Sequence, residues 1–277
     1  MVSMTGEKAK TAIRKIARWR FSVQLLSLAI WLDPLLVRCH TVCSPVFHCY
    51  SCPLATFACP IGVIANFSAI HMIPFLALGM LIVAGALAGS FICGWTCPFG
   101  LLQDLLDRVP TPKFVLPNWT GCFRFLVLLG LVIIVPYWWG DGHALFFCRV
   151  CPAGALEAAV PNTIHSAMSG SGVVWPTATK TVILLVFVVL ALFTWRPWCS
   201  ALCPLGVVFS LCNGASLLVM RFHRSQCVEC VDCRSLCHTG EEARGRINQI
   251  RCIRCLECTR CRAVTVGTAF GRTKDAG

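Results

Sequence analysis

The segment CGWTCPFG at residues 93–100 recurs in this chain as CSALCPLG at residues 199–206. Both copies have the pattern C-x-x-x-C-P-[FL]-G, and each follows an apolar run, at residues 70–92 and 179–198. A shorter motif of the form CxxCP, first CYSCP and then CRVCP, stands before each of these runs. The chain therefore reads as two copies of one unit, in the order span, CxxCP site, span, CxxxCP site. Such repeats are common in membrane proteins.

The composition is that of an integral membrane protein. Of the 277 residues, 57% are hydrophobic and 13% are charged, whereas soluble domains carry about 25% charged residues. The formal net charge is +12, but the basic residues lie at the chain ends and in loops. They do not form one face interleaved with aromatic residues, so we expect lipid and not nucleic acid as the partner.

Four apolar runs predict an all-α membrane bundle of four transmembrane helices with an internal two-fold repeat. The clearer three, at residues 70–92, 123–139 and 179–198, are close to the ~20 residues that cross a bilayer, and the first, at residues 21–37, is weaker because Asp33 and Pro34 interrupt it. If the N-terminus is cytoplasmic, the inner segments carry 6, 2 and 12 Lys or Arg, against three in the outer loops (Arg38, Arg149 and Lys180). This bias predicts a multi-pass protein of a prokaryotic inner membrane with both termini in the cytoplasm.

The paired motifs predict two metal centres in the membrane domain. A cubane [4Fe–4S] cluster needs four thiolates, and each motif supplies two. The CxxxCP sites would hold an inner cluster through Cys93, Cys97, Cys199 and Cys203. The CxxCP sites would hold an outer cluster through Cys49, Cys52, Cys148 and Cys151.

The outer side has three further cysteines. Cys59 is an alternative outer ligand, because Pro60 and Gly62 follow it in the segment ACPIG. Cys39 and Cys43 are predicted either to form a disulfide or to bind further metal. Two cysteines outside these motifs are interpreted as ordinary buried thiols, Cys122 and Cys212.

The tail after residue 221 contains two dense cysteine runs. The runs are C-x2-C-x2-C-x3-C at residues 227–237 and C-x2-C-x2-C-x2-C at residues 252–261. They match the plan of bacterial two-cluster ferredoxins, in which the fourth cysteine of each run binds the other cluster. One predicted set is Cys227, Cys230, Cys233 and Cys261, and the other is Cys252, Cys255, Cys258 and Cys237.

The tail departs from the usual ferredoxin pattern at two points. His238 and Arg262 stand where proline is usual, and the second run is one residue short before Cys261. Even so, four cysteines within so few positions suit a cubane better than structural zinc, which usually takes two separated pairs. A disulfide scaffold is excluded as the main interpretation, because such scaffolds are short and polar. The abundant arginines of the tail have two open interpretations. Either they favour a reduced cluster or an acidic partner, or they reflect the positive-inside bias alone.

Three regions follow from these patterns. Residues 1–20 form a basic cytoplasmic segment, residues 21–221 a four-helix transmembrane domain, and residues 222–277 a cytoplasmic two-cluster ferredoxin domain with its tail.

The segment CGWTCPFGLLQDLLD, the later CSALCPLG and the ferredoxin-like tail resemble the membrane-integral polyferredoxin family. That family includes the quinol-oxidising subunit of periplasmic nitrate reduction (NapH type) and the membrane domain of the nitrous-oxide reductase regulator (NosR type). The resemblance covers residues from about 21 to 262 and implies electron transfer between the quinone pool or cytoplasmic donors and periplasmic reductases. The added outer cysteines depart from the simpler nitrate-type members and favour a different route.

The leading hypothesis is an electron-transfer subunit with four [4Fe–4S] clusters. It would join a cytoplasmic or quinone-side donor to an extracytoplasmic acceptor, with redox partner proteins at both faces and no catalytic residue of its own. The first alternative is a quinol dehydrogenase subunit with a quinone site, for which Gln103, Asp104 and Asp107 are candidates or, alternatively, the polar face of a surface helix. The second alternative is a redox maturation factor for a metalloenzyme.

Overall fold

The computed structural model describes residues 19–31, 43–49, 51–52, 55, 57–169, 177–228, 233, 237 and 247–269. The described part is mainly helical. The first half contains α2 (Arg20–Trp31), α3 (Pro60–Ala69), α4 (Phe75–Ala88), α5 (Phe91–Trp95) and α6 (Pro98–Leu106). The second half contains α7 (Phe123–Leu126), α8 (Val135–Trp139), α9 (Phe147–Val150), α10 (Val160–Met168), α11 (Ala178–Phe193) and α12 (Pro204–Leu211). The strands of the tail are β1 (Leu218–Phe222) and β2 (Val264–Thr268).

One described helix is long and apolar enough to cross a membrane. It runs from Trp119 to Trp139, joins α7 to α8 through a π-helical stretch at Val127–Ile134, and has a mean hydropathy of 2.0. α4 and α11 have 14 and 16 residues, which is shorter than the ~20 residues that span a bilayer. Part of the first predicted span, residues 32–37, lies outside the described residues. The count of four transmembrane helices therefore stays a prediction.

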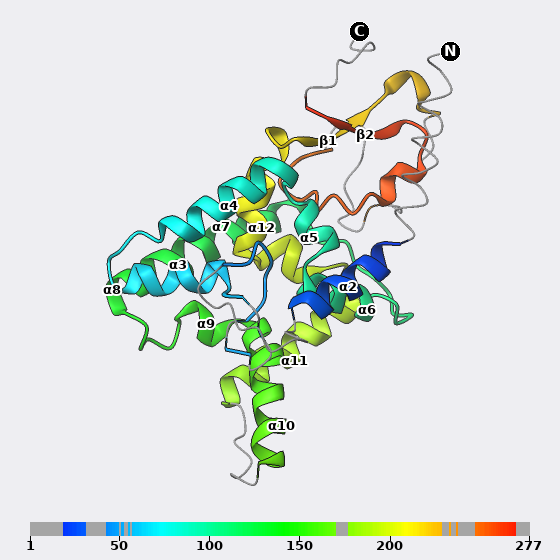
Figure 1. Ribbon diagram of the computed structural model, residues 1–277. Coiled ribbons are helices and arrows are strands. Elements are labelled where there is room, and N and C mark those ends of the chain that lie inside the picture. The colour runs from blue at the N-terminus through cyan, green and yellow to red at the C-terminus, as the bar shows by residue number, and fades with distance from the viewer. Residues whose placement is uncertain are drawn as a thin grey trace.

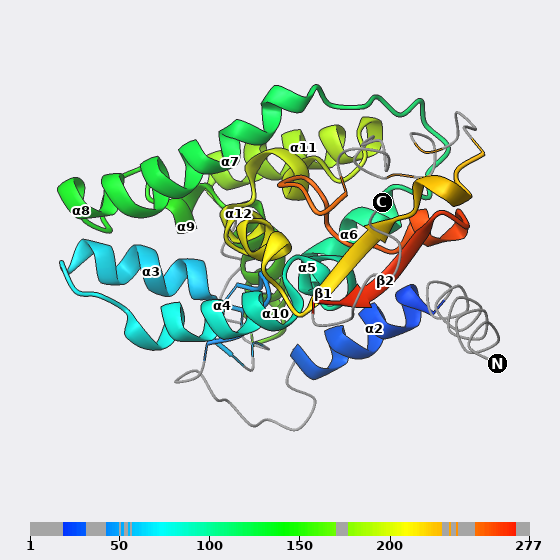
Figure 2. The same ribbon diagram turned by 90° about the horizontal axis from the view of Figure 1, so that it is seen from above.

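The outer faces of the long helices carry large apolar side chains exposed to the surroundings. Phe75 is 77% exposed and Trp138 is 71% exposed, and further examples on the same helices are Leu76, Ile82, Leu126, Leu129, Leu185 and Val186. Soluble monomers rarely expose apolar surface of this extent. Helices α3, α4, α7 and α8 lie side by side in both views (Figures 1 and 2).

Proline sets the start of three helices. α3, α6 and α12 each begin with a proline that directly follows a cysteine, and the cysteine is the N-cap. Proline suits the first helical position, because its missing N–H would have no partner there and its φ is already helical. Each Cys-Pro pair therefore places a thiol at the N-terminus of a helix, on a cysteine whose own backbone is extended.

The loop at residues 43–59 folds into the interior. Among its described residues Val46 and Ala55 are fully buried, and Phe47 is 3% exposed. Phe47 packs against the rings of Phe99, Phe147 and Trp198, at centroid distances of 5.7, 6.3 and 5.9 Å. Irregular backbone at membrane depth is tolerated where protein buries it. The loop thus belongs to the core of the helical part.

The tail packs against the membrane part through a small two-stranded sheet. β1 and β2 pair antiparallel, with Leu218 opposite Thr268 and Phe222 opposite Val264. Met220 and Val264 form an apolar cluster with Trp95 of α5 and Leu256, and Figure 2 shows the sheet beside α5 and α2.

Two buried arginines tie the tail down further. Arg254 donates to Ala88 O at 3.2 Å and to Ser216 Oγ at 2.6 Å. Arg251 donates to Leu116 O at 3.2 Å. These two guanidinium groups therefore bind this chain's own backbone and side chains, a role that neither sequence interpretation of the tail arginines included.

Candidate metal centres

The four cysteines of the CxxxCP motifs line one pocket, which we call the CxxxCP pocket. The four motif cysteines in its lining are Cys93, Cys97, Cys199 and Cys203, and none is more than 7% exposed. Cys93 ends up beside Cys199 although 106 positions separate them in the sequence, because α5 and α6 pack against the turn that leads into α12. The structure therefore brings together the complete set that the sequence predicted for the inner cluster.

Close backbone packing shapes this pocket. A Cβ at Gly100 would meet Cys93 O at 3.0 Å, and one at Gly206 would meet Cys199 O at 3.4 Å. Glycine in the C-P-x-G motif therefore allows each turn to close over its own first cysteine. Gly206 N–H also donates to Cys203 Sγ at 3.4 Å.

The donor set of the pocket fits a [4Fe–4S] cluster. Burial raises the pKa of Cys97 to about 12, so this thiol stays protonated near neutral pH unless a cation stabilises its thiolate. Among the described residues no group of three or more His, Cys, Asp or Glu is placed to hold a single metal ion. A cubane takes four thiolates, and this pocket offers four buried motif cysteines that could supply them.

Two buried arginines supply positive charge next to these sulfurs. Arg196 is 0% exposed and donates to Cys93 O at 3.4 Å. Arg124 is 1% exposed and donates to Cys199 O at 3.2 Å. A cluster with four thiolate ligands is anionic, so the two guanidinium groups would offset its charge and favour its reduced state.

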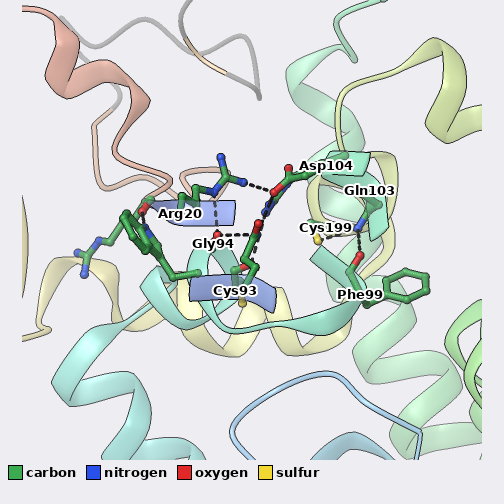
Figure 3. A network of polar contacts seen from close by, with 11 residues as sticks. Arg20, Cys93, Gly94, Phe99, Gln103, Asp104 and Cys199 are labelled. Atoms are coloured by element: carbon green, nitrogen blue, oxygen red, sulfur yellow. Dashed lines mark hydrogen bonds and ion pairs between the residues drawn. The ribbon is translucent and has the colours of Figure 1, made fainter. Parts of the chain in front are cut away.

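Asp104 on α6 anchors Arg196 and also Arg20 from α2 (Figure 3). It accepts from Arg196 Nε at 2.6 Å, from Arg20 at 2.5 Å and from Gln24 at 2.9 Å. Burial alone would raise the pKa of Asp104, but the two guanidinium groups hold it at about 2. Asp104 is therefore an ionised anchor inside the structure, and the interpretation of this segment as an exposed polar face is wrong at this residue.

Gln103 touches a candidate ligand directly. Its side chain is 0% exposed, and its Nε2 donates to Cys199 Sγ at 3.2 Å. Its Oε1 accepts from Trp198 N at 3.2 Å. Figure 3 shows the amide held between Phe99 O and the Cys199 sulfur. The exposed-face interpretation is wrong here too, because Gln103 has turned inward to satisfy these groups.

We expect Gln103→Glu to lower the reduction potential of the cluster in the CxxxCP pocket. Glutamate keeps the acceptor for Trp198 N–H but removes the N–H that stabilises negative charge on the cluster. A hydrogen-bond difference of about 1 kcal/mol corresponds to about 40 mV for a one-electron couple. An EPR-monitored redox titration measures the shift, and the tail clusters in the same sample serve as the internal control. An unchanged potential would contradict the assigned contact.

The second run of the tail closes one side of the CxxxCP pocket. Cys252 and Ile253 line it together with the four motif cysteines. Trp95 Nε1 donates to Arg254 O at 3.2 Å, and Ser90 Oγ donates to Cys252 O. Gly94 makes room for this contact, because a Cβ there would lie 2.5 Å from Ile253 O. Gly94 and Trp95, which lie between Cys93 and Cys97, thus contact the tail directly.

The structure also brings together the tail cysteines of one predicted set. Cys237 and Cys252 interact electrostatically, and both interact with Cys255 and Cys258. Of the other set, Cys233 and Cys261 pack against one apolar cluster, Cys227 is half-buried, and Cys230 lies outside the described residues.

A second cysteine pocket is lined by Cys49, Cys59, Cys148 and Cys151. Burial raises the pKa of Cys59 to about 12, as for Cys97, so these thiols also need a cationic centre to ionise. Cys52 is buried and interacts with Cys49, but it is not among the lining residues.

A carboxylate orders the entrance of the second cysteine pocket. Glu157 Oε2 accepts from Cys49 N at 2.8 Å and lies 3.1 Å from His48 Nδ1. Lys180 also lines the pocket. The hydrogen bond between Glu157 and Cys49 N fixes the backbone of Cys49 at the point where the loop enters the core.

One side chain belongs to the walls of both pockets. Phe47 lines the CxxxCP pocket and the second cysteine pocket, and Cys97 Sγ lies 3.8 Å from Phe47 O. The two cysteine sets are therefore neighbours inside one core.

The remaining cysteines differ in surroundings. Cys43 is buried and forms an isolated bridge with Ala58, while its predicted partner Cys39 lies outside the described residues. Cys212 is half-buried against Gly85. Cys122 is exposed, so the prediction of a buried thiol is wrong there, because Cys122 ends the short helical turn that precedes α7.

Sequence reasoning missed several residues that shape these sites, among them Gly94, Arg124 and Phe47. Arg124 carried a usable signal, since a lone charge at the edge of a long apolar run often marks a site. Gly94 and Phe47 carried none, because their roles depend on contacts with segments far away in the chain.

Comparison with known proteins agrees with this geometry. A family model described as a 4Fe-4S binding domain matches residues 70–117 and 181–224. Each matched segment contains one C-x-x-x-C-P site. No solved structure matches the chain.

Several curated proteins are similar to this chain. The methylamine utilization ferredoxin-type protein MauN of Methylorubrum extorquens is 29% identical over 66% of the chain and 56% of its own length. The putative electron transport protein YccM of Escherichia coli is 24% identical over 61% of the chain and 46% of its own length. The ferredoxin-type protein NapH of Haemophilus influenzae is 23% identical over 62% of the chain and 56% of its own length. The chain thus spans about half the length of these relatives.

Proposed function

We propose, from the premise that this chain is a relative of the ferredoxin-type electron-transport proteins, that it passes single electrons through a chain of [4Fe–4S] clusters. Such clusters supply reversible one-electron reduction when bound. The protein supplies the cysteine sets, the buried charges that balance them and the packing that places one set next to another.

One observation carries the proposal: the two cysteine pockets adjoin each other, and one cysteine set of the tail adjoins the CxxxCP pocket. Cys252 of the tail lines the CxxxCP pocket, and Phe47 lines both that pocket and the second cysteine pocket. Electron tunnelling falls steeply with distance, so a relay needs neighbouring centres. A relay that runs from the tail to the CxxxCP pocket and then to the second cysteine pocket meets that need, because each site adjoins the next one.

We further propose four clusters, two in a four-span membrane domain with an internal two-fold repeat and two in a cytoplasmic ferredoxin domain. Both termini would face the cytoplasm of an inner membrane, as the bias of Lys and Arg favours. A donor protein or a quinone-side donor would reduce the tail side, and an extracytoplasmic protein would oxidise the cluster of the second pocket.

The test is transfer across a sealed bilayer. The purified chain is prepared anaerobically and reconstituted into liposomes that enclose ferricyanide, and titanium(III) citrate is added outside. We expect about sixteen irons per chain and ferricyanide reduction faster than in protein-free liposomes. Fewer than about twelve irons, or a rate equal to that of empty liposomes, contradicts the four-cluster relay.

A quinol dehydrogenase role is the second candidate, and one residue favours it. Asp107 Oδ2 is shielded from solvent and has no hydrogen-bond partner among the described residues, while Lys113 lies 3.5 Å from Oδ1. Burial raises the pKa of Asp107 to about 6, which suits a proton acceptor near neutral pH.

Quinol oxidation would then proceed as follows. Conversion of a quinol to its quinone releases two electrons, which bound clusters would take up one at a time, and two protons, of which Asp107 would accept one and solvent water the other. Adding a short-chain quinol to the oxidised protein in liposomes separates the candidates. Bleaching of the cluster absorbance supports quinol oxidation, and no bleaching leaves the relay fed by a protein donor.

A further inference from the structure

Five cysteines in this chain are followed directly by proline, and four of them share one backbone conformation. Three are N-caps with φ and ψ of −70° and 123° at Cys59, −74° and 120° at Cys97, and −70° and 114° at Cys203. Cys151 has −77° and 124°, and a helical segment follows it from Pro152. The fifth, Cys52, precedes residues 53 and 54, which lie outside the described residues.

The same four cysteines share a sulfur contact. In each case the backbone N–H of the glycine three residues later points at the thiol sulfur, in the pairs Cys59–Gly62, Cys97–Gly100, Cys151–Gly154 and Cys203–Gly206. Backbone N–H groups aimed at ligand sulfurs are a general feature by which proteins tune iron–sulfur clusters. A C-P-x-G turn of this kind is therefore a preformed ligand position.

The position of Cys59 agrees with its conformation. Cys59 lines the second cysteine pocket with Cys49, Cys148 and Cys151. It interacts electrostatically with Cys148 and Cys49, and Cys151 interacts with Cys59 and Cys49. A Cβ at Gly154 would lie 3.7 Å from Cys49 Sγ, so the turn from the second half of the chain packs directly on the loop from the first half.

The order of elements gives Cys59 and Cys151 equivalent places. Cys59 starts α3, after which the chain runs through α4 to the site at Cys93. Cys151 precedes the helical segment that ends at Met168, after which the chain runs through α11 to the site at Cys199. Cys52 has no counterpart in this order, since it lies seven positions before the turn that starts the helix.

We infer that Cys59, together with Cys49, Cys148 and Cys151, ligates a [4Fe–4S] cluster in the second cysteine pocket, and that Cys52 is a buried thiol beside it. This inference rests on the proposed relay and names the ligands of its outermost centre. The loop at residues 43–59 then supplies two ligands, Cys49 and Cys59, which are ten positions apart. Of these, Cys59 is the one whose sulfur faces a backbone N–H, that of Gly62.

The test compares Cys59→Ala with Cys52→Ala in the full chain, purified anaerobically in detergent. Cys43→Ala is the matched control, since Cys43 is another buried thiol of the same loop and does not line the pocket. Iron and acid-labile sulfide are counted, and EPR spectra of the reduced protein are recorded. We expect Cys59→Ala to lose about four of about sixteen irons, and Cys52→Ala and Cys43→Ala to match the unmodified chain.

Retention of about twelve irons in Cys59→Ala, with an unchanged elution volume in size exclusion, shows that the chain is still folded. Cys59→Ser is the second variant, because a serine oxygen is a weaker ligand. We expect it to change the EPR spectrum of one cluster, while Cys52→Ser leaves every signal unchanged. Loss of iron from Cys52→Ala but not from Cys59→Ala overturns the inference and leaves the relay intact. An unmodified chain with about twelve irons and no loss in either variant overturns the outer centre itself.

Discussion

A chain in which Cys93 and Cys199 are both replaced by alanine is expected to lose the cluster of the CxxxCP pocket and all electron transfer across the bilayer. These two cysteines supply two of the four motif sulfurs in that pocket. The CxxxCP pocket adjoins both the tail and the second cysteine pocket, through Cys252 and Phe47. Without its cluster, the remaining centres are no longer neighbours.

The choice of these two cysteines limits damage to the fold. Cys97 and Cys203 cap α6 and α12, so alanine at Cys93 and Cys199 leaves both helix starts in place. We expect the variant to keep about twelve of about sixteen irons and to reduce enclosed ferricyanide no faster than empty liposomes. The matched control is Cys43→Ala with Cys122→Ala, which removes two thiols outside both pockets. A normal rate in the Cys93 and Cys199 variant would exclude the CxxxCP pocket from the path.

Gly94→Ala is expected to uncouple the tail from the membrane part without removing any cluster. A Cβ at this position would lie 2.5 Å from the backbone oxygen of Ile253 and 3.4 Å from that of Arg254. Backbone cannot swing aside as a side chain can, so the segment that carries Cys252 must move away from α5. Overpacking of this kind costs about 1–3 kcal/mol, and we expect transfer in the liposome assay to slow by about tenfold or more.

The fold offers a close control for this variant. Gly79 lies within α4 and has no atom within 4 Å of an added Cβ, so Gly79→Ala makes the same chemical change in open space. Both variants should keep their iron content. Hydrogen exchange at residues 252–256 should rise in Gly94→Ala alone, because this segment moves away from α5 and becomes open to solvent. Equal transfer rates in the two variants would show that the docked tail does not feed the CxxxCP pocket.

The relation to ferredoxin-type proteins and the cluster chemistry could be predicted from local patterns. Cysteines two or three positions apart, followed by proline and glycine, form turns whose geometry depends on adjacent residues alone. That is why the set at Cys93, Cys97, Cys199 and Cys203 was predictable as a group, and why the kinship it implied is confirmed by the matched 4Fe-4S segments. Hydropathy likewise predicted the apolar helix that ends at Trp139.

Other features depended on contacts between distant segments. Gln103 and Asp104 looked like part of a polar surface, but Arg196, Arg20 and the Cys199 sulfur draw them inward. Phe47 and Gly94 carried no local signal, because their contacts are with segments far away in the chain.

Cysteine spacing by itself thus predicted iron–sulfur clusters as the cofactors, since closely spaced cysteines can face one centre. Only the tertiary structure decided which surplus thiol joins which pocket, which arginines balance the charge, and that the cysteine sets share walls. The physical reason is that packing brings together groups 50 to 160 positions apart, such as Cys97 with Phe47 and Trp95 with Arg254, and no local pattern encodes those pairings.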